Sequence, residues 1–265
     1  MAYEDRTANE LMNELRDQFV QSKGFADTLR SNADPIWRRI DSHPFLVELE
    51  NGKLPIEKYR TYAIQNYFYF AESFRSKSAA AVRAPTTAGA LIFRDWASYI
   101  GHEFEKYLAL LRAVGLTEER LKQATTDPTV PLPAARAYVD YVFKVYSTGS
   151  MGEIAACILP CAWSYSPRQI GGLGCPLRIA KGLADHYGVD RGTALSYGTY
   201  SAQKPHLLYL LSLKNYVTEE VKRESRETID RIRDVFRRCS EYEYMWWDLA
   251  YRHDVQKDRE IGAYY

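Results

Sequence analysis

Apolar residues recur at helical spacing along most of this chain, and no useful length of it alternates apolar and polar residues as a strand does. Residues 88–114 show this most clearly, because their large apolar side chains fall on one face of a helix. These side chains are Leu91, Ile92, Trp96, Ile100, Phe104, Leu108 and Leu111. Since no repeat and no clear linker divides the sequence, we expect an all-α fold, a single-domain helical bundle.

Proline, glycine and capping residues predict where the helices begin and end. The main predicted helices cover residues 34–50, 56–82, 88–114, 134–146, 177–187, 207–216 and 218–251, with others starting at 117 and 151. We expect Met245 to face inward on the last helix. Residues 1–33 are interpreted as an N-terminal extension helix, 34–252 as the main domain and 253–265 as a loose tail. Within the main domain, residues 167–205 form an elaborated connection.

The composition narrows the classes of function. The net charge of +1 gives no electrostatic signature of nucleic-acid or membrane binding. Residues 154–167 form the longest uncharged run, which is too short to cross a bilayer. The N-terminus has no apolar core of a secretory signal, and the four cysteines lack zinc or disulfide spacing, so we predict a cytoplasmic protein. The 21 tyrosines suit a polar but water-poor pocket.

One apolar stretch, residues 154–165, combines a thiol with aromatic side chains. Cys161 lies within it, between Pro160 and Trp163. A buried cysteine is often an inert packing residue, but it is a nucleophile when a base from elsewhere in the chain reaches it. The residues of this segment alone favour the inert packing role over the nucleophile.

Several motifs, taken in order, resemble the TenA family, also called thiaminase II, of the haem-oxygenase-like helical folds. The resemblance covers roughly residues 34–251. The matching residues are Trp37, His43-Pro44-Phe45, Gly52-Lys53-Leu54, Gln65-Asn66-Tyr67-Phe68-Tyr69-Phe70, Tyr138 with Tyr141, Leu159-Pro160-Cys161-Ala162-Trp163-Ser164-Tyr165, and Glu243-Tyr244-Met245-Trp246-Trp247-Asp248-Leu249-Ala250.

The resemblance implies a cofactor-free hydrolase that cleaves a C–N bond of an aminopyrimidine or a thiamin-related compound, in thiamin salvage or degradation. Cys161 then matches the family nucleophile and Glu243 the acid/base. Burial of Glu243 among aromatic rings would raise its pKa toward neutrality, which suits that role. The side chains matching substrate-binding positions are Tyr69, Tyr138, Tyr165 and Trp246. The family also implies a small-molecule substrate and a homo-oligomer, a tetramer.

Two residues depart from the family pattern. Asn66 stands where the family has an aspartate that bonds the pyrimidine, and asparagine cannot offer a charge-assisted bond to a protonated ring. His206 stands where a tyrosine usually starts the helix after the connection, and it is either structural or a proton carrier. We place both among the substrate-binding residues and expect the substrate, or the strength of its recognition, to differ.

Two alternatives to the hydrolase stay open. The departures at Asn66 and His206 fit a family member that binds a small heterocycle without turnover. Glu103 and Glu105 beside His102 resemble part of a metal site, as in a metal-dependent oxidase of the same fold. Tyr107 stands one turn after Glu103 where a histidine ligand would help, so we predict no metal site.

Overall fold

The structure is a computed structural model that describes residues 23–166, 174–199 and 203–253. No strand occurs in these ranges, which confirms the predicted all-α class. In chain order the helices are α2 (Phe25–Asn32), α3 (Asp34–Asp41), α4 (Pro44–Glu50), α5 (Ile56–Arg83), α6 (Thr87–Ala113), α7 (Glu118–Thr126), α8 (Pro133–Thr148), α9 (Met151–Ser164), α10 (Cys175–His186), α11 (Arg191–Gly198), α12 (Lys204–Glu220), the 3₁₀ turn η2 (Val221–Arg223) and α13 (Arg226–Arg252).

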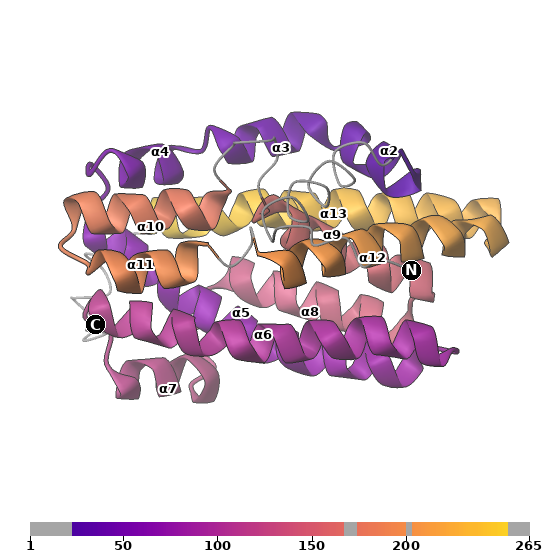
Figure 1. Cartoon of the computed structure of the whole chain (residues 1–265), viewed down its shortest axis with the longest axis horizontal. Coiled ribbons are helices and arrows are strands. Elements are labelled where there is room, and N and C mark those ends of the chain that lie inside the picture. Colours follow the sequence, from indigo (N-terminus) through magenta and orange to yellow (C-terminus); the bar gives the residue numbers. More distant parts are fainter. Residues whose placement is uncertain (1–22, 167–173, 200–202, 254–265) are drawn as a thin grey trace, which may run out of the picture.

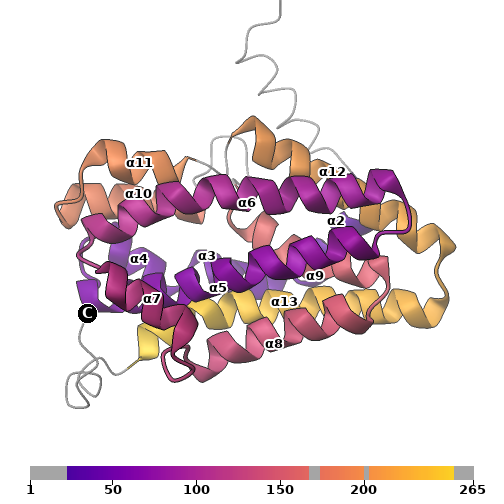
Figure 2. The ribbon, with the colours of Figure 1, turned by 90° about the horizontal axis from the view of Figure 1, so that it is seen from below.

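Helix α9 lies at the centre of the bundle and packs against α8, α12 and α13 (Figure 2). Its first turn is fixed by a capping box, in which Ser150 and Glu153 satisfy each other's backbone N–H groups. After Glu153 the helix carries no charge, and Ile154, Ala155 and Leu159 are fully buried. A helix that is apolar all round has no face for water, so the other helices surround it.

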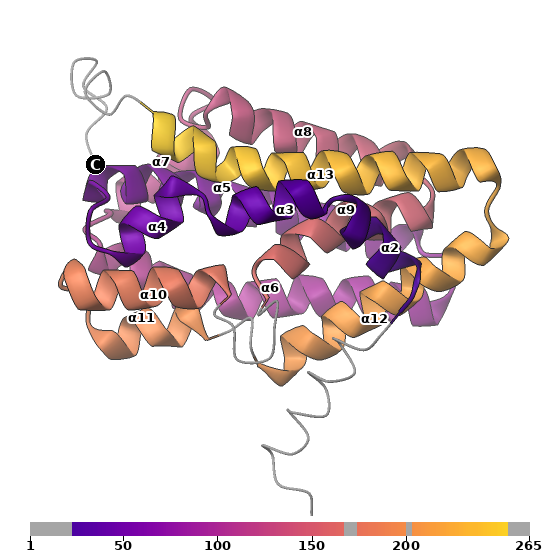
Figure 3. The same cartoon turned by 90° about the horizontal axis from the view of Figure 1, so that it is seen from above.

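Helices α5 and α6 pack along each other as a long antiparallel pair (Figures 1 and 2). The short helices α2, α3 and α4 lie along α13 on another side of the bundle (Figure 3). Helices α10 and α11 pair at one end of the molecule, where α10 packs on α4 and α11 on α6. This arrangement leaves the central pocket between the long helices.

Two predicted helices are divided in the structure. The helix expected over 34–50 is α3 and α4, because Pro44 begins a new helix and the His43 ring caps it by accepting a hydrogen bond from Phe45 N. The helix expected over 218–251 begins at Arg226, where the Ser225 hydroxyl accepts from Thr228 N at 3.1 Å. Of the residues before it, 218–220 belong to α12 and Val221–Arg223 form η2.

Met245 was wrongly expected to face inward. It is 41% exposed, whereas its neighbour Trp246 is 3% exposed. The side chains of Trp246 and Trp247 occupy the inward positions of this turn of α13, so Met245 falls on the outer face.

The predicted connection over 167–205 contains two helices, α10 and α11, where the sequence indicated one. Gly188 ends the first with a positive φ of 71°, and the Asp190 side chain caps the second by accepting from Thr193 N. The expected apolar positions of the extension helix before residue 23 and the tail after 253 lie outside the described residues.

Candidate active site

A pocket lies between α5, α6, α8, α9, α12 and α13, and every side chain predicted for the site lines it. These side chains are Asn66, Tyr69, Tyr138, Cys161, Tyr165, His206, Glu243 and Trp246. Asn66 and Tyr69 come from α5, and His206 comes from the first turn of α12. Positions far apart in the sequence are therefore brought to one cavity.

Glu243 is held by donors from two other helices. The Tyr138 hydroxyl on α8 donates to Oε1 at 2.7 Å, and the Ser164 hydroxyl at the end of α9 donates to Oε2 at 3.2 Å. The Cys161 thiol is in hydrogen-bond contact with this carboxyl and with the Tyr69 hydroxyl. A thiol and a carboxyl group are thus in direct contact inside the pocket.

Burial sets the protonation of both groups. It raises the pKa of Glu243 to about 7, although hydrogen bonds from Tyr138 and Ser164 lower it. Burial, together with the nearby Glu243 carboxyl, raises the pKa of Cys161 to about 12. The thiol is therefore protonated near neutral pH, and it needs a base to become a nucleophile. Glu243, whose pKa lies near neutrality, is placed to be that base.

A buried lysine in the pocket was missed by sequence reasoning. Lys77 on α5 donates to the Ser73 hydroxyl, and its Nζ lies 5.9 Å from the Tyr69 ring centroid and 5.8 Å from that of Trp96. Burial lowers the pKa of Lys77, whereas the Cys161 thiol and other nearby groups raise it. The spacing from Asn66 through Ser73 to Lys77 places all three on one helical face, which is the signal available in the sequence.

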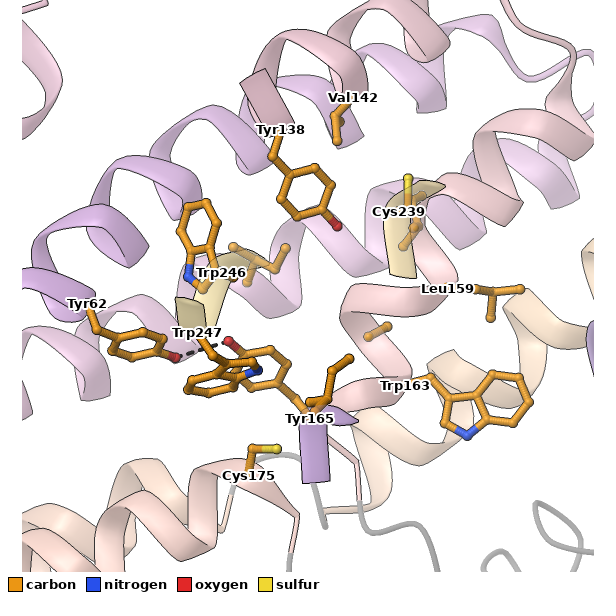
Figure 4. Close-up of a cluster of buried hydrophobic side chains, with 14 of the residues drawn as sticks. Tyr62, Tyr138, Val142, Leu159, Trp163, Tyr165, Cys175, Cys239, Trp246 and Trp247 are labelled. Atoms are coloured by element: carbon orange, nitrogen blue, oxygen red, sulfur yellow. Dashed lines mark hydrogen bonds between the residues drawn. The ribbon is translucent and has the colours of Figure 1, made fainter. Parts of the chain in front are cut away.

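Aromatic rings form the walls of the pocket. The Tyr69 and Tyr138 rings stack with centroids 5.3 Å apart, and the Trp246 ring lies edge-on to Tyr69 at 5.3 Å. The hydroxyl of Tyr165 is 3.0 Å from that of Tyr62, so these two hydroxyls are hydrogen-bonded (Figure 4). Flat walls of this kind suit a flat heterocycle.

The two residues that depart from the family pattern are both buried in this pocket. Nε2 of His206 lies 2.8 Å from Ser166 Oγ and 3.0 Å from the Ala162 carbonyl oxygen. Burial lowers the pKa of His206 to about 4, which keeps the ring neutral at physiological pH. The amide nitrogen of Asn66 lies beside the Tyr107 hydroxyl, and within the described ranges it makes no hydrogen bond of standard length and angle.

The residues considered for a metal site are arranged differently from a ligand cluster. Glu103 is buried in the pocket wall and pairs with Lys106 at 2.9 Å, while Glu105 and His102 are exposed. Across the described part of the chain, no group of three or more His, Cys, Asp and Glu side chains could hold a metal ion. None of the helices described is long and apolar enough to cross a membrane.

Together, the bundle and its aromatic pocket with a central thiol–carboxyl contact define a helical protein of the haem-oxygenase-like fold with a candidate small-molecule site. The fold alone is shared by several kinds of protein, so the sequence comparisons identify the group within it. The chain belongs to the TENA/THI-4/PQQC family, whose sequence profile matches residues 30–253. The resemblance inferred from the motifs is confirmed.

Related proteins in two bacteria bear the name aminopyrimidine aminohydrolase. That of Helicobacter pylori is 26% identical over 228 residues, which cover 84% of this chain and 97% of that protein. That of Bacillus subtilis strain 168 is 26% identical over 248 residues, which cover 89% of this chain and 94% of that protein.

Solved structures show the same fold. A TenA homologue from P. horikoshii OT3 superposes with a TM-score of 0.70 at 25% identity, covering 87% of this chain and 99% of that one. A domain of unknown function with a heme oxygenase-like fold, from Shewanella denitrificans OS217, gives a TM-score of 0.69 at 15% identity. It covers 89% of this chain and 95% of that one, and it confirms the predicted haem-oxygenase-like fold.

Proposed function

We propose that this protein is a hydrolase that cleaves a C–N bond of an aminopyrimidine or a thiamin-related compound. The observation that carries the proposal is the contact between the Cys161 thiol and the Glu243 carboxyl in an aromatic pocket. The names of the relatives in Helicobacter pylori and Bacillus subtilis support the same chemistry. A nucleophile in contact with a base is the arrangement that covalent catalysis requires.

In the proposed reaction, the Cys161 sulfur adds to an electron-poor ring carbon while Glu243 takes the thiol proton. Glu243 then gives that proton to the leaving nitrogen as its C–N bond breaks. A water molecule next adds to the carbon that lost nitrogen and returns a proton to Glu243. The sulfur then leaves the ring carbon and takes a proton from Glu243, which restores the aromatic ring. Overall, the reaction converts an amine and water into ammonia and an alcohol.

The neighbouring residues serve this sequence of proton transfers. The hydroxyls of Tyr138 and Ser164 hold the Glu243 carboxyl in one orientation. The carboxyl therefore gives and takes its proton from a fixed position. The Lys77 ammonium and the Tyr69 hydroxyl lower the pKa of Cys161 and so favour the thiolate that attacks. The Trp246 ring provides a flat surface against which the substrate ring stacks.

The decisive test compares Cys161→Ala with the wild type on aminomethyl- and formylaminomethyl-pyrimidines and thiamin, following the pyrimidine alcohol by chromatography. We expect the wild type to form the alcohol and Cys161→Ala to lose at least about a thousandfold in kcat. Cys157→Ala is the matched control, since Cys157 lies one turn earlier on α9 and contacts Cys239 at 3.4 Å. It should retain turnover, and full activity of Cys161→Ala would refute the mechanism.

A second candidate is a protein that binds a small heterocycle without turnover. The neutral side chains of Asn66 and His206 in the pocket favour it, since neither provides a charge for a protonated ring. Saturable binding of the same pyrimidines by folded wild-type protein, with no product after long incubation, would support this function. Product formation by the wild type would rule it out.

A further inference from the structure

One cationic side chain of the pocket has no carboxylate paired with it. Lys77 on α5 is 2% exposed, and within the described ranges its Nζ makes no ion pair. Its hydrogen-bond partner is the Ser73 hydroxyl, so up to two of the three N–H groups of the ammonium stay available. A buried ammonium is costly unless an anion or several acceptors surround it, so this group indicates a place for an anionic ligand.

Other hydrogen-bond donors lie next to Lys77. Its Nζ is 5.8 Å from the ring centroid of Trp96, whose buried Nε1–H group has no acceptor in the part of the chain that the structure describes. The Ser73 hydroxyl, which accepts from Lys77, can still donate its own proton. All three residues line the pocket, and together we call them the donor subsite. The donor subsite thus combines N–H and O–H donors with one cationic side chain.

The donor subsite adjoins the thiol–carboxyl contact. Lys77 Nζ is 5.9 Å from the ring centroid of Tyr69, whose hydroxyl contacts the Cys161 thiol. Asn66 lies 11 residues before Lys77 on α5, which is about 16 Å along the helix axis. A substrate ring held near Asn66 and Tyr69 therefore leaves the donor subsite to the group beyond the reacting carbon, which is the leaving group.

The acidic groups of the pocket do not neutralise Lys77. Glu103 is paired with Lys106 at 2.9 Å. The pKa of Glu243 is about 7, so this carboxyl is protonated in about half of the molecules at neutral pH, and the Cys161 thiol, whose pKa is about 12, is protonated in nearly all of them. Burial lowers the pKa of Lys77, and a bound anion would oppose that shift. An anionic substituent on the ligand therefore complements the charge of the pocket.

We propose that the donor subsite binds a carboxylate on the leaving amine, so that the preferred substrate is an N-(pyrimidinylmethyl) derivative of a short amino acid. Lys77 forms the ion pair, and Ser73 and Trp96 donate to the same carboxylate. This specificity rests on the proposed function and deepens it by naming the leaving group. The bond between the methylene carbon and the amino acid nitrogen breaks, that nitrogen takes the proton from Glu243, and water supplies the hydroxyl of the alcohol. The products are the pyrimidine alcohol and a free amino acid in place of ammonia.

The test compares two ligands that differ in one charge. They are the N-(aminopyrimidinylmethyl) derivatives of glycine and of glycinamide, titrated by calorimetry into Cys161→Ala so that turnover does not disturb the measurement. We expect this parent protein to bind the glycine compound about ten- to a hundredfold more tightly than the glycinamide compound. The reason is that a charge-assisted hydrogen bond is roughly twice as strong as a neutral one.

Lys77→Met in the same parent removes the charge and keeps the length of the side chain. It should bind the glycine compound about ten- to a hundredfold more weakly and the glycinamide compound within about threefold of the parent. A merely structural role of Lys77 would weaken both ligands equally. Arg75→Met is the matched control, since Arg75 is an exposed cation on the same helix, and it should change both affinities by less than about twofold.

Trp96→Phe keeps an aromatic ring and removes the N–H donor, so it provides a second variant should Lys77→Met fail to fold. It should weaken binding of the glycine compound by about three- to tenfold more than that of the glycinamide compound. Equal binding of the two ligands by the parent, no binding of either, equal losses of both in the subsite variants, or the same loss in Arg75→Met would overturn the assignment.

The outcomes for the donor subsite and for the hydrolase are separable. Preference for the glycine compound in Cys161→Ala, with no pyrimidine alcohol formed by the wild type, would leave the donor subsite standing and refute only the hydrolase. Alcohol formed from the simple aminomethyl-pyrimidine, with no preference for the glycine compound, would refute only the donor subsite.

Discussion

The protonation of Glu243 is determined by side chains from three helices. The carboxyl stands on α13, the Tyr138 hydroxyl reaches it from α8 and the Ser164 hydroxyl from α9. Burial raises its pKa to about 7 even though both hydrogen bonds oppose the shift. Such a carboxyl both accepts and releases a proton near neutral pH, at a cost in stability when it is ionised.

That cost makes the stability of the protein depend on pH. The folded state keeps the Glu243 proton up to about pH 7, whereas the unfolded chain releases it near its ordinary pKa of 4.5. The free energy of unfolding should therefore fall by on the order of 3 kcal/mol from this group as the pH rises through that range. Glu243→Gln removes the term, so its stability relative to the wild type should increase from pH 5 to pH 8.

Urea unfolding of both proteins at the two pH values measures this difference. Glu227→Gln is the control, since Glu227 is an exposed residue of the same helix, and its pH dependence should follow the wild type. Parallel pH dependence of Glu243→Gln and the wild type would show that the carboxyl is not destabilised by burial.

Residues that line the pocket were predictable where a motif contained them. Cys161, Glu243 and the pocket tyrosines lie in motifs quoted from the sequence, and the structure brings them together. Lys77 was not found, and Glu103 was considered only as a metal ligand. Lys77 and Glu103 stand on long helices with polar residues on several faces, so their spacing alone does not show that they are buried. Their burial depends on which other helices cover α5 and α6.

Among the helices, α10 shows how close packing depends on the absence of a side chain. A Cβ added at Gly182 would lie 2.6 Å from the Leu49 carbonyl oxygen on α4. That atom belongs to the backbone, so one helix would have to move. The approach of α10 to α4 is thus possible only with glycine at this position.

We expect Gly182→Ala to lower the free energy of unfolding by about 1–3 kcal/mol, as overpacking does. Gly101→Ala on α6 is the matched control, because a Cβ there meets nothing within 4 Å. That variant should be more stable than the wild type by up to about 1 kcal/mol, since alanine favours helix. Thermal unfolding of both variants measures the difference, and equal effects at the two positions would contradict this account of the α4–α10 contact.

The number of helices was harder to predict from the sequence than the all-α fold class. The long helices α5 and α6 agree with the sequence within one residue at each end, because their apolar spacing is sustained and Pro85 separates them. The sequence analysis did not predict the breaks before α4 and α13. A proline or a serine cap inside an apolar pattern also occurs in a single bent helix, so the pattern alone does not require a break. Packing of α3 and α4 on α13 decides in favour of two.

At the scale of the whole molecule, one ion pair joins α2 to the core. Lys214 on α12 is buried, and its Nζ lies 2.7 Å from Asp27 Oδ1 and 4.5 Å from the ring centroid of Trp163. Burial lowers the pKa of Lys214, and Asp27 opposes that shift. The N-terminal segment is thereby tied to the central helix α9 through α12.

Asp27→Asn should lower the free energy of unfolding by about 1–3 kcal/mol. This loss lies between those that follow from breaking an exposed ion pair and from breaking a fully buried one. The amide retains an acceptor for Gly24 N, so the loss reports mainly the charge of Lys214. Replacing both partners, as Asp27→Asn with Lys214→Met, should recover part of that loss because no buried charge is left alone. Chemical unfolding of the single and double variants provides the measurement, and an Asp27→Asn variant as stable as the wild type would show that the pair contributes nothing.

The pocket draws its walls from residues spread between Asn66 and Trp246. Of the helices that line the pocket, α5 and α6 leave the ribosome first, and their pocket face, with Tyr69 and Lys77, is covered only by helices made later. No nascent chain that stops before α13 holds both the thiol and the carboxyl. A ligand therefore cannot guide the early steps of folding, because the pocket is complete only once α13 has been made.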